Sequence, residues 1–423
     1  MSLHHQHRAR TLWLSGILHA FTHLYQVALL PLYFLILHDS AFQLKTLEEA
    51  TFLVTVLMLS YFIPAYPVGI LADKFSKRKL LAFGLAVNAA GFLALGLSRS
   101  YSSAIASMII SGFGGSFFHP AATALIARLF PEGTGRALGL FGIGASAGFF
   151  LGPLYTGWRS GHNGWRAPVI EVGLLGIVTA AAFYFLADEE PAHPHEHTPK
   201  DHRLFPSPAL LGLFLTAAFC FSLRDFTGSS MGSLGSIYLQ KAHGLSPATT
   251  GGLLSMIFIA SAISNPIFGK LSDRGVGRWA SFALGVAGII VAAFPHFPVR
   301  FAGAVYAIYG FFFMASYPMV EGALMGSVPH HVRGRVFGVF ITVGGILGNL
   351  AHWAMGAYAR HLGPAATQPE SYHGIYLALG GFIGLSLLGL PCLKALRKRE
   401  STAGELVTPA PARLPNIALL PEK

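Results

Sequence analysis

The sequence predicts an all-α membrane protein with twelve transmembrane helices in two pseudo-symmetric six-helix bundles. Hydrophobic residues make up 53% of the 423 residues and charged residues only 11%, whereas a soluble domain has about 25% charged residues. Twelve apolar runs reach the ~20 residues that cross a ~30 Å hydrocarbon core as a helix. Motifs of the first six runs recur in the last six, which predicts a repeat.

The twelve predicted spans follow one another with short connections. Helices are expected in all of them, because lipid cannot satisfy open backbone groups and the runs are too long for barrel strands. The first span is expected to stay in the protein, since it is long, contains two histidines and lacks a small-residue cleavage pattern after it. The spans lie at residues 11–37, 50–72, 80–98, 102–130, 135–158, 167–187, 208–239, 248–270, 279–297, 300–328, 334–359 and 373–395.

The distribution of basic residues predicts the orientation of the chain. The net charge is +11 with histidine neutral, and alternate loops hold most of the bases, as in 74–79 and 394–399. The other loops hold only scattered bases such as Lys45 and Arg99. By the positive-inside rule, both termini are expected in the cytoplasm and the chain in the inner (plasma) membrane. Binding to nucleic acid is not expected.

Two charged segments half a chain apart indicate the repeat. "GILADKFSKRK" (69–79) shares its glycine, leucine and aspartate positions with "GKLSDRGVGRW" (269–279). "HPAATALIARLFP" (119–131) aligns its prolines with those of "YPMVEGALMGSVP" (317–329). We therefore expect an N-terminal bundle (1–187), a cytoplasmic linker (188–207), a C-terminal bundle (208–398) and a disordered cytoplasmic tail (399–423).

No enzyme chemistry is expected. The sequence has no metal-spacing motif, nucleophile elbow or phosphate-cradling loop, so no cofactor and no metal are predicted. Cys220 and Cys392 are interpreted as core residues. The linker histidines could bind a metal, but nothing pre-organises them, so a solvated linker is favoured; they are His193, His195, His197 and His202.

The pattern resembles the major facilitator superfamily over essentially the whole chain up to about residue 398. The segment 69–79 is similar to that family's loop motif between spans two and three, with Lys74 and Ser76 departing from the usual arginine and glycine. The resemblance implies a gating role for the residues of this loop, its repeat and the starts of spans five and eleven. They are Gly69, Asp73, Lys74, Arg78, Arg136, Asp273, Arg274 and Arg335.

Span five is similar to a motif of family members that export compounds in exchange for protons. Gly148 and Gly152 would let another helix approach closely and Pro153 would let the span bend, with Gly139 at the start of the motif. General membrane packing is the alternative. "GILHAFTHLYQ" (16–26) and "GFGGSFFHPAATALIA" (112–127) resemble the fosmidomycin-resistance branch of drug exporters, which favours an acid where His23 stands.

Ionisable groups at membrane depth form the candidate pathway for substrate and protons, because each costs about 2.5–3.5 kcal/mol to insert. The histidines and glutamine of span one share a face at i, i+4, i+7 spacing, with satisfied core residues as the alternative. The adjacent arginine and aspartate of span seven are expected to need separate partners, since neighbouring residues point to different faces. The candidates are His19, His23, Gln26, His119, Arg224, Asp225 and Glu321.

These residues predict a role for each group. Arg224 would anchor an anion or form a structural ion pair, and Glu321 would bind a proton or pair at an inner gate. Six aromatic residues are expected in the cavity wall: Tyr25, Phe117, Phe118, Phe219, Phe312 and Tyr317.

The predicted function is proton-coupled efflux of a small drug-like, anionic or amphipathic compound by alternating access. The expected partners are that compound, protons and lipid, and the chain is expected to be a monomer. The alternatives are a proton-coupled importer of an organic anion and, less favoured, a membrane sensor that transports nothing.

Overall fold

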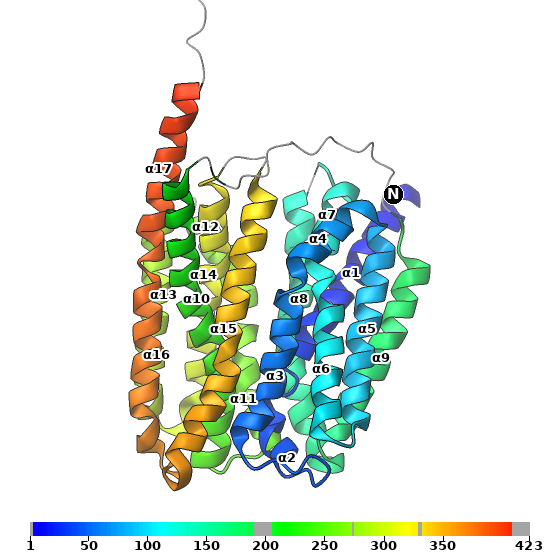
Figure 1. Cartoon of the computed structure of the whole chain (residues 1–423), viewed down its shortest axis with the longest axis vertical. Coiled ribbons are helices and arrows are strands. Elements are labelled where there is room, and N and C mark those ends of the chain that lie inside the picture. Colours follow the sequence, from blue (N-terminus) through cyan, green and yellow to red (C-terminus); the bar gives the residue numbers. More distant parts are fainter. Residues whose placement is uncertain are drawn as a thin grey trace, which may run out of the picture.

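The computed structural model describes residues 3–132, 134–189, 205, 207–272, 275–328 and 332–407. Helices make up most of this part of the chain (Figure 1). The α-helices of this part of the chain are α1 (Leu3–Val27), α2 (Tyr33–Leu37), α3 (Leu47–Phe62), α4 (Ala65–Lys74), α5 (Lys77–Leu97), α6 (Tyr101–Ser116), α7 (Phe118–Leu129), α8 (Thr134–Asn163), α9 (Arg166–Leu186), α10 (Pro208–Ile237), α11 (Pro247–Ile259), α12 (Ser261–Ser272), α13 (Val276–Ala293), α14 (Ala302–Met325), α15 (Arg333–Leu362), α16 (His373–Ser386) and α17 (Gly389–Val407).

Twelve helical segments within the described ranges are long and apolar enough to cross a membrane, which confirms the predicted fold class. Several spans consist of two helices in series. Span two breaks between α3 and α4 at Pro64, and span four between α6 and α7 just before Pro120. α17 continues as a helix to Val407, past the predicted start of the tail at residue 399, and most of the predicted linker lies outside the described residues.

Local sequence signals explain where the spans begin. α3 starts with a capping box, in which the Glu49 carboxylate accepts hydrogen bonds from the backbone and the hydroxyl of Thr46. α10 and α11 each start with a serine whose hydroxyl accepts a backbone N–H, followed by a proline in the first turn. Proline is favoured there because its missing N–H would have no partner in the helix.

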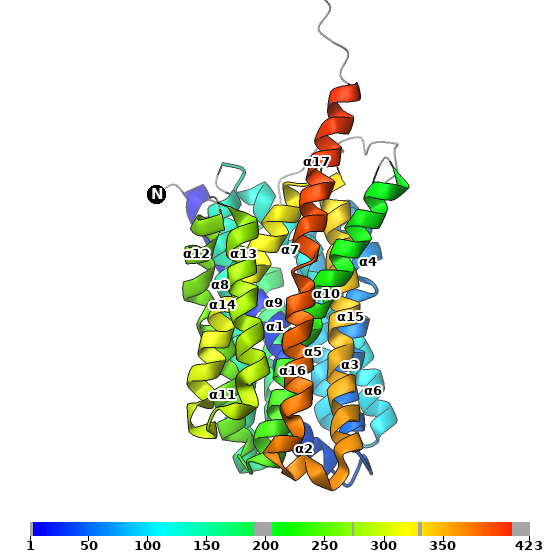
Figure 2. The same ribbon diagram turned by 90° about the vertical axis from the view of Figure 1, so that its left-hand side faces the viewer.

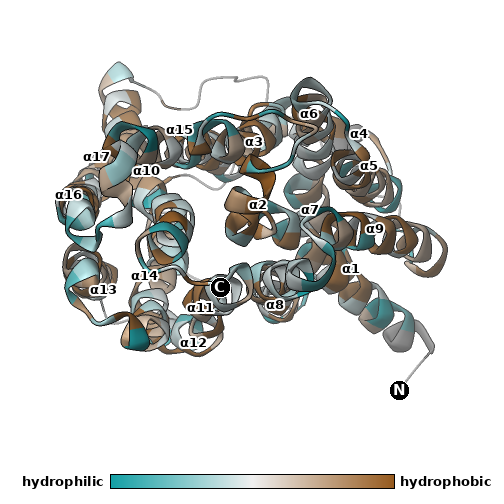
Figure 3. Cartoon of the chain, turned by 90° about the horizontal axis from the view of Figure 1, so that it is seen from below, coloured by the Kyte–Doolittle hydropathy of each residue, from teal (hydrophilic) through white to brown (hydrophobic). Residues whose placement is uncertain are grey.

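The helices form two groups, α1–α9 and α10–α17, that stand side by side (Figures 1 and 3). Within the first group, α1 and α8 touch backbone to backbone. A Cβ added at Gly144 would lie 2.1 Å from the carbonyl oxygen of Gly16, and one at Gly148 would lie 2.0 Å from that of Ala20. Only glycine permits such a close approach, so α1 and α8 form one tightly packed unit.

Two seams join the groups. At the α8–α11 seam, a Cβ added at Gly251 would lie 2.1 Å from the carbonyl oxygen of Pro153. At the α3–α15 seam, a Cβ added at Gly356 would lie 2.1 Å from the hydroxyl oxygen of Thr51. These seams lie toward the face opposite the start of α1. We call the face where α1 begins and α17 ends the terminal face, and the other the opposite face (Figures 1 and 2).

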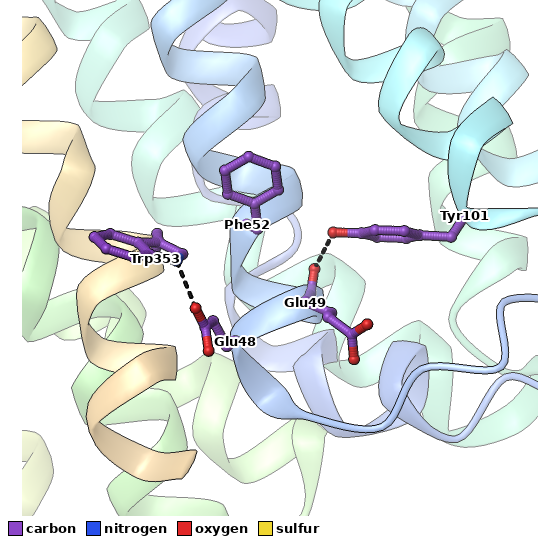
Figure 4. Close-up of a pocket in the computed structure, with 5 residues that line it drawn as sticks. All are labelled: Glu48, Glu49, Phe52, Tyr101 and Trp353. Carbon is purple, nitrogen blue, oxygen red and sulfur yellow. Dashed lines mark hydrogen bonds between the residues drawn. The ribbon is translucent and has the colours of Figure 1, made fainter. Parts of the chain in front are cut away.

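Side chains close the α3–α15 seam at the opposite face. The Trp353 indole N–H donates to the Glu48 carboxylate at 2.7 Å (Figure 4). Arg360 approaches the same carboxylate at 2.9 Å. The Tyr101 hydroxyl of α6 donates to the Glu49 carbonyl oxygen of α3 at 2.8 Å. One carboxylate of the first group thus holds two side chains of the second.

Asp39 fastens the end of the first span at the opposite face. Its carboxylate accepts hydrogen bonds from Trp165 at 2.8 Å, from Arg166 at 2.9 Å and from the backbone N–H of Ala41 at 2.9 Å. Burial raises the pKa of Asp39, but these hydrogen bonds outweigh burial and bring the pKa below its ordinary value.

Candidate functional site

A cavity of about 2850 Å³ lies between the two groups of helices. Its wall includes residues of spans one, two, four, five, seven, eight, ten and eleven. It reaches Lys77, Arg128 and Arg335 near the terminal face, whereas toward the opposite face its lining stops at Leu30, Gly232 and neighbouring residues, short of the seams. The cavity therefore opens toward the terminal face and is closed at the opposite one.

On the first group's side, three histidines meet in the cavity wall. α1 supplies His19 and His23, α7 supplies His119, and one ring nitrogen from each lies within 4.8 Å of those of the other two. The Nε2 atoms of His19 and His23 are 3.0 Å apart. His23 Nδ1 contacts Gln26 Oε1 at 2.9 Å, so the structure also brings the predicted glutamine to the cluster.

On the second group's side, the cavity wall holds Arg224 and Asp225 of α10. The prediction that these neighbours need separate partners is wrong. Arg224 Nη2 lies 2.8 Å from Asp225 Oδ1, and its Nε donates to the same oxygen at 3.0 Å. The long arginine side chain folds back to its neighbour, although the two Cα–Cβ bonds point apart. Its guanidinium also lies over the Tyr317 ring, 4.0 Å from the ring centre.

Two groups beside this ion pair lack a partner. Arg224 Nη1 is buried and makes no hydrogen bond with a described residue. Glu321 of α14 lines the cavity and has Arg224 and Asp225 as charged neighbours, yet within the described residues it makes no hydrogen bond and no ion pair. Among the described residues, this wall thus holds a buried cationic donor without a hydrogen bond and, beside it, a cavity-lining carboxylate without one.

A hydrogen-bonded chain that was not predicted from the sequence closes the cavity at its end toward the opposite face. The Tyr33 hydroxyl lies 2.8 Å from the Ser233 hydroxyl, and Ser233 lies 2.6 Å from His352 Nδ1. His352 Nε2 continues the chain to the Asn349 side-chain oxygen at 3.2 Å. The signal in the sequence that could have indicated this chain is His352, a single histidine within an apolar span. The chain joins α2 of the first group to α10 and α15 of the second.

Of the predicted gating residues, only some belong to the described part of the chain. Gly69 and Arg335 line the cavity, and Arg136 is exposed. Arg78 donates to the Ala187 carbonyl oxygen at 3.2 Å and approaches Glu189 at 3.4 Å, which ties α5 to the end of α9. Asp273 and Arg274 lie outside the described residues, as do the side chains of Asp73 and Lys74.

The glycines of the predicted span-five motif differ in their surroundings. Gly148 and Gly152 pack against α1, and the Pro153 carbonyl oxygen meets Gly251 across the α8–α11 seam. Gly139 makes no close approach, since a Cβ there would have no neighbour within 4 Å.

The predicted aromatic wall is mostly wrong. Of the six residues, Tyr317 lines the cavity. Phe219 is 55% exposed on the outside of the helices, and Tyr25 is buried with its hydroxyl donating to the Val172 carbonyl oxygen. Phe117, Phe118 and Phe312 likewise fall outside the cavity lining, whereas Phe149, Phe258 and Phe313 belong to it. Which face of an apolar helix turns inward is decided by neighbouring helices, which the sequence alone does not reveal.

Twelve membrane-spanning segments in two groups around a cavity that is open at one face are the architecture of a membrane transporter. Residues 12–352 match the family model described as Major Facilitator Superfamily, and the chain belongs to this family. The family resemblance predicted from the sequence is confirmed.

Similar proteins include the Fosmidomycin resistance protein of Escherichia coli, which is 26% identical over 70% of this chain and 73% of that protein. An uncharacterized MFS-type transporter of Mycobacterium tuberculosis, Rv1250, is 33% identical, but the match spans only 33% of this chain and 24% of that relative. A bacterial homolog of the human lysosomal transporter Spinster, solved in an inward-facing and unoccupied conformation, has the same fold. It is 16% identical, with a TM-score of 0.71 over 96% of this chain and 99% of that one.

Proposed function

We propose that this chain is a proton-driven exporter that exchanges protons for a small amphipathic compound by alternating access. The observation that carries the proposal is Glu321, a carboxylate without a partner among the described residues on the wall of a cavity that opens at one face. A proton and a cationic or hydrogen-bond-donating group of the compound compete for this carboxylate, and such competition is what antiport requires.

The choice of Glu321 follows from its neighbours. Of the pathway residues, four could carry the proton: His23, His119, Asp225 and Glu321. Asp225 is bonded to Arg224 by two contacts, so it is held as a counter-ion. The two histidines belong to the three-histidine cluster on the other wall. Glu321 is the candidate that can exchange a proton for a ligand without breaking an ion pair.

The orientation of the chain is compatible with export. The basic residues at the terminal face support a cytoplasmic position for that face by the positive-inside rule. In this orientation the cavity is open to the cytoplasm, where an exporter takes up its compound. The resemblance to the Escherichia coli Fosmidomycin resistance protein supports efflux of a drug-like compound. Rocking of the two groups about the cavity would then open the α3–α15 and α8–α11 seams.

One observation favours a second function, the proton-coupled import of an organic anion. The buried Arg224 Nη1 has an unused donor. An anion bound there would repel the Glu321 carboxylate, so that proton and anion bind together rather than in competition. Such cooperative binding produces symport.

Transport by proteoliposomes with an imposed pH gradient tests both functions. Movement of an amphipathic amine against the proton gradient supports export, and movement of an organic anion with protons supports import.

In Glu321→Gln, export loses its dependence on the gradient because no competing proton can bind. An importer would instead bind its anion at all pH values, because glutamine mimics the protonated acid. Glu370→Gln, an exposed residue outside the cavity, is the matched control. Unchanged gradient dependence in Glu321→Gln would refute the assignment of Glu321.

A further inference from the structure

The three-histidine cluster requires an explanation that the transport cycle does not supply. His19 and His23 are one helical turn apart on α1, and α7 brings His119 against both rings with ring centres 5.5 Å from each. His19 and His23 are buried, and all three residues border the cavity.

The hydrogen bonds of two rings fix where their lone pairs point. His19 Nδ1 lies 3.0 Å from the Phe141 carbonyl oxygen, which can only accept, so this nitrogen carries the hydrogen. His23 Nδ1 faces the Gln26 side-chain oxygen in the same way. With the Gln26 amide oriented so that Oε1 faces His23, both Nε2 atoms of the neutral rings present lone pairs, and these atoms face each other at 3.0 Å. Two lone pairs repel at this distance unless an electron-deficient atom lies between them.

The third ring has free ligand capacity. Neither ring nitrogen of His119 makes a hydrogen bond with a described residue, and its ring meets those of His19 and His23 edge to face or tilted. Its side chain can therefore rotate toward the other two without losing a hydrogen bond.

The surroundings match those of a metal centre. Aromatic rings enclose the cluster, with Phe141 stacked on His19 at 4.0 Å and Phe149 beside His23 at 4.3 Å. No described carboxylate makes a hydrogen bond or an ion pair with the three rings. Histidine ligands of metals commonly donate their other N–H to a carbonyl or carboxylate oxygen, which orients the ring. Phe141 and Gln26 supply such acceptors here.

We propose that His19, His23 and His119 bind one divalent transition-metal ion of the zinc, cobalt or nickel class, with a fourth coordination position facing the cavity. Metal–nitrogen bonds of about 2.0–2.1 Å place tetrahedral ligand atoms about 3.3 Å apart. The 3.0 Å between the two Nε2 atoms fits this spacing, and rotation of His119 closes the remaining gap. Three imidazoles without carboxylates select such ions over Mg²⁺ and Ca²⁺, which prefer oxygen ligands.

The open position gives the ion a chemical consequence. The cluster carries no negative charge, so a bound divalent ion keeps its full charge and draws an anionic or chelating ligand to its free coordination position. That ligand would lie in the cavity, opposite the Arg224 and Glu321 wall. The metal site does not rest on the proposed direction or coupling of transport.

Titration of the purified full-length protein with Co²⁺ tests the proposal through the visible absorption bands of the tetrahedral ion. The affinity tag must lack histidine, because a polyhistidine tag binds the same ions. We expect one site whose bands appear with Co²⁺, vanish when Zn²⁺ is added and persist with excess Mg²⁺. His119→Ala should abolish the bands, and Gln26→Leu should weaken Co²⁺ binding about 10–100-fold through loss of ring orientation.

Two controls keep the outcome decisive. His352→Ala removes another buried cavity histidine outside the cluster and should leave the bands intact. Glu321→Gln should leave them intact as well, which separates this result from the transport proposal. The proposal is overturned if the wild-type protein shows no tetrahedral bands, or if the bands survive in His119→Ala. A proton shared between His19 and His23 would then account for their close contact.

Discussion

Gly251→Ala should shift the protein away from the state that is open at the terminal face. The added Cβ would lie 2.1 Å from the Pro153 carbonyl oxygen across the α8–α11 seam, whereas real Cβ contacts stay beyond 3.0 Å. The two helices must therefore separate by about 1 Å, and the obstacle is backbone that cannot rotate away. Overpacking of this kind costs about 1–3 kcal/mol, which corresponds to about a 5- to 150-fold change in the population ratio.

The neighbouring glycine provides a matched control. A Cβ at Gly252 would meet only the end of the Leu154 side chain at 3.9 Å, so Gly252→Ala should leave the seam unchanged. Both variants change the helix propensity of α11 by the same substitution. A difference between them therefore reports the contact across the seam.

Pulsed electron paramagnetic resonance between spin labels at the opposite face measures the shift. Labels at the exposed positions His162 of the first group and Lys241 of the second report the separation of the groups, in a background with Cys220 and Cys392 replaced by alanine. We expect a longer-distance population that grows in Gly251→Ala and not in Gly252→Ala. Thermal unfolding transitions should first show that both variants are folded. Identical distance distributions for the two would then refute the steric argument.

Three further predictions concern stability and closure. Trp353→Phe removes its hydrogen bond across the α3–α15 seam. The equilibrium between the two states, read from the same label distances, should shift by about 1 kcal/mol, less than in Gly251→Ala. An equal or larger shift would contradict this ranking. Asp225→Asn leaves Arg224 buried without its counter-ion and should lower the free energy of unfolding by about 3 kcal/mol or more, measured by denaturant titration in detergent. The double variant Arg224→Met/Asp225→Asn should recover part of that loss, and strict additivity would show that the pair is not coupled. Asp39→Asn should lower the melting temperature at pH 7, because the pKa of Asp39 in the fold lies below its unfolded value of about 4. Its charge therefore stabilises the fold above that value, and this effect is lost as the pH falls through the folded pKa. A deficit that does not shrink between pH 7 and pH 3 would argue against the ionic origin.

The spans were predictable because their signal is local. Each run of about 20 apolar residues defines a helix wherever its neighbours lie, and all twelve predicted spans coincide with helical segments of the described chain. Prolines and capping residues set the ends. The same locality explains why His19 and His23 were placed on one face from their spacing alone.

Contacts between distant helices were not predictable to the same degree. His119 joins the cluster only because α7 packs against α1, a hundred residues away in sequence. Phe219 turns outward because other helices cover the opposite side of α10. The error at Arg224 has a different cause: the direction of a Cα–Cβ bond says little about where a long guanidinium side chain ends.

The hydrogen-bonded chain from Tyr33 through Ser233 and His352 to Asn349 has a consequence for the transport cycle. Separation of the two groups at this end breaks these hydrogen bonds and leaves buried hydroxyl and imidazole groups without partners. Each group left unsatisfied costs about 1–3 kcal/mol. Water molecules must take their place as the groups separate. Alternation is therefore a wetting transition as well as a rotation, and its barrier depends on the activity of water.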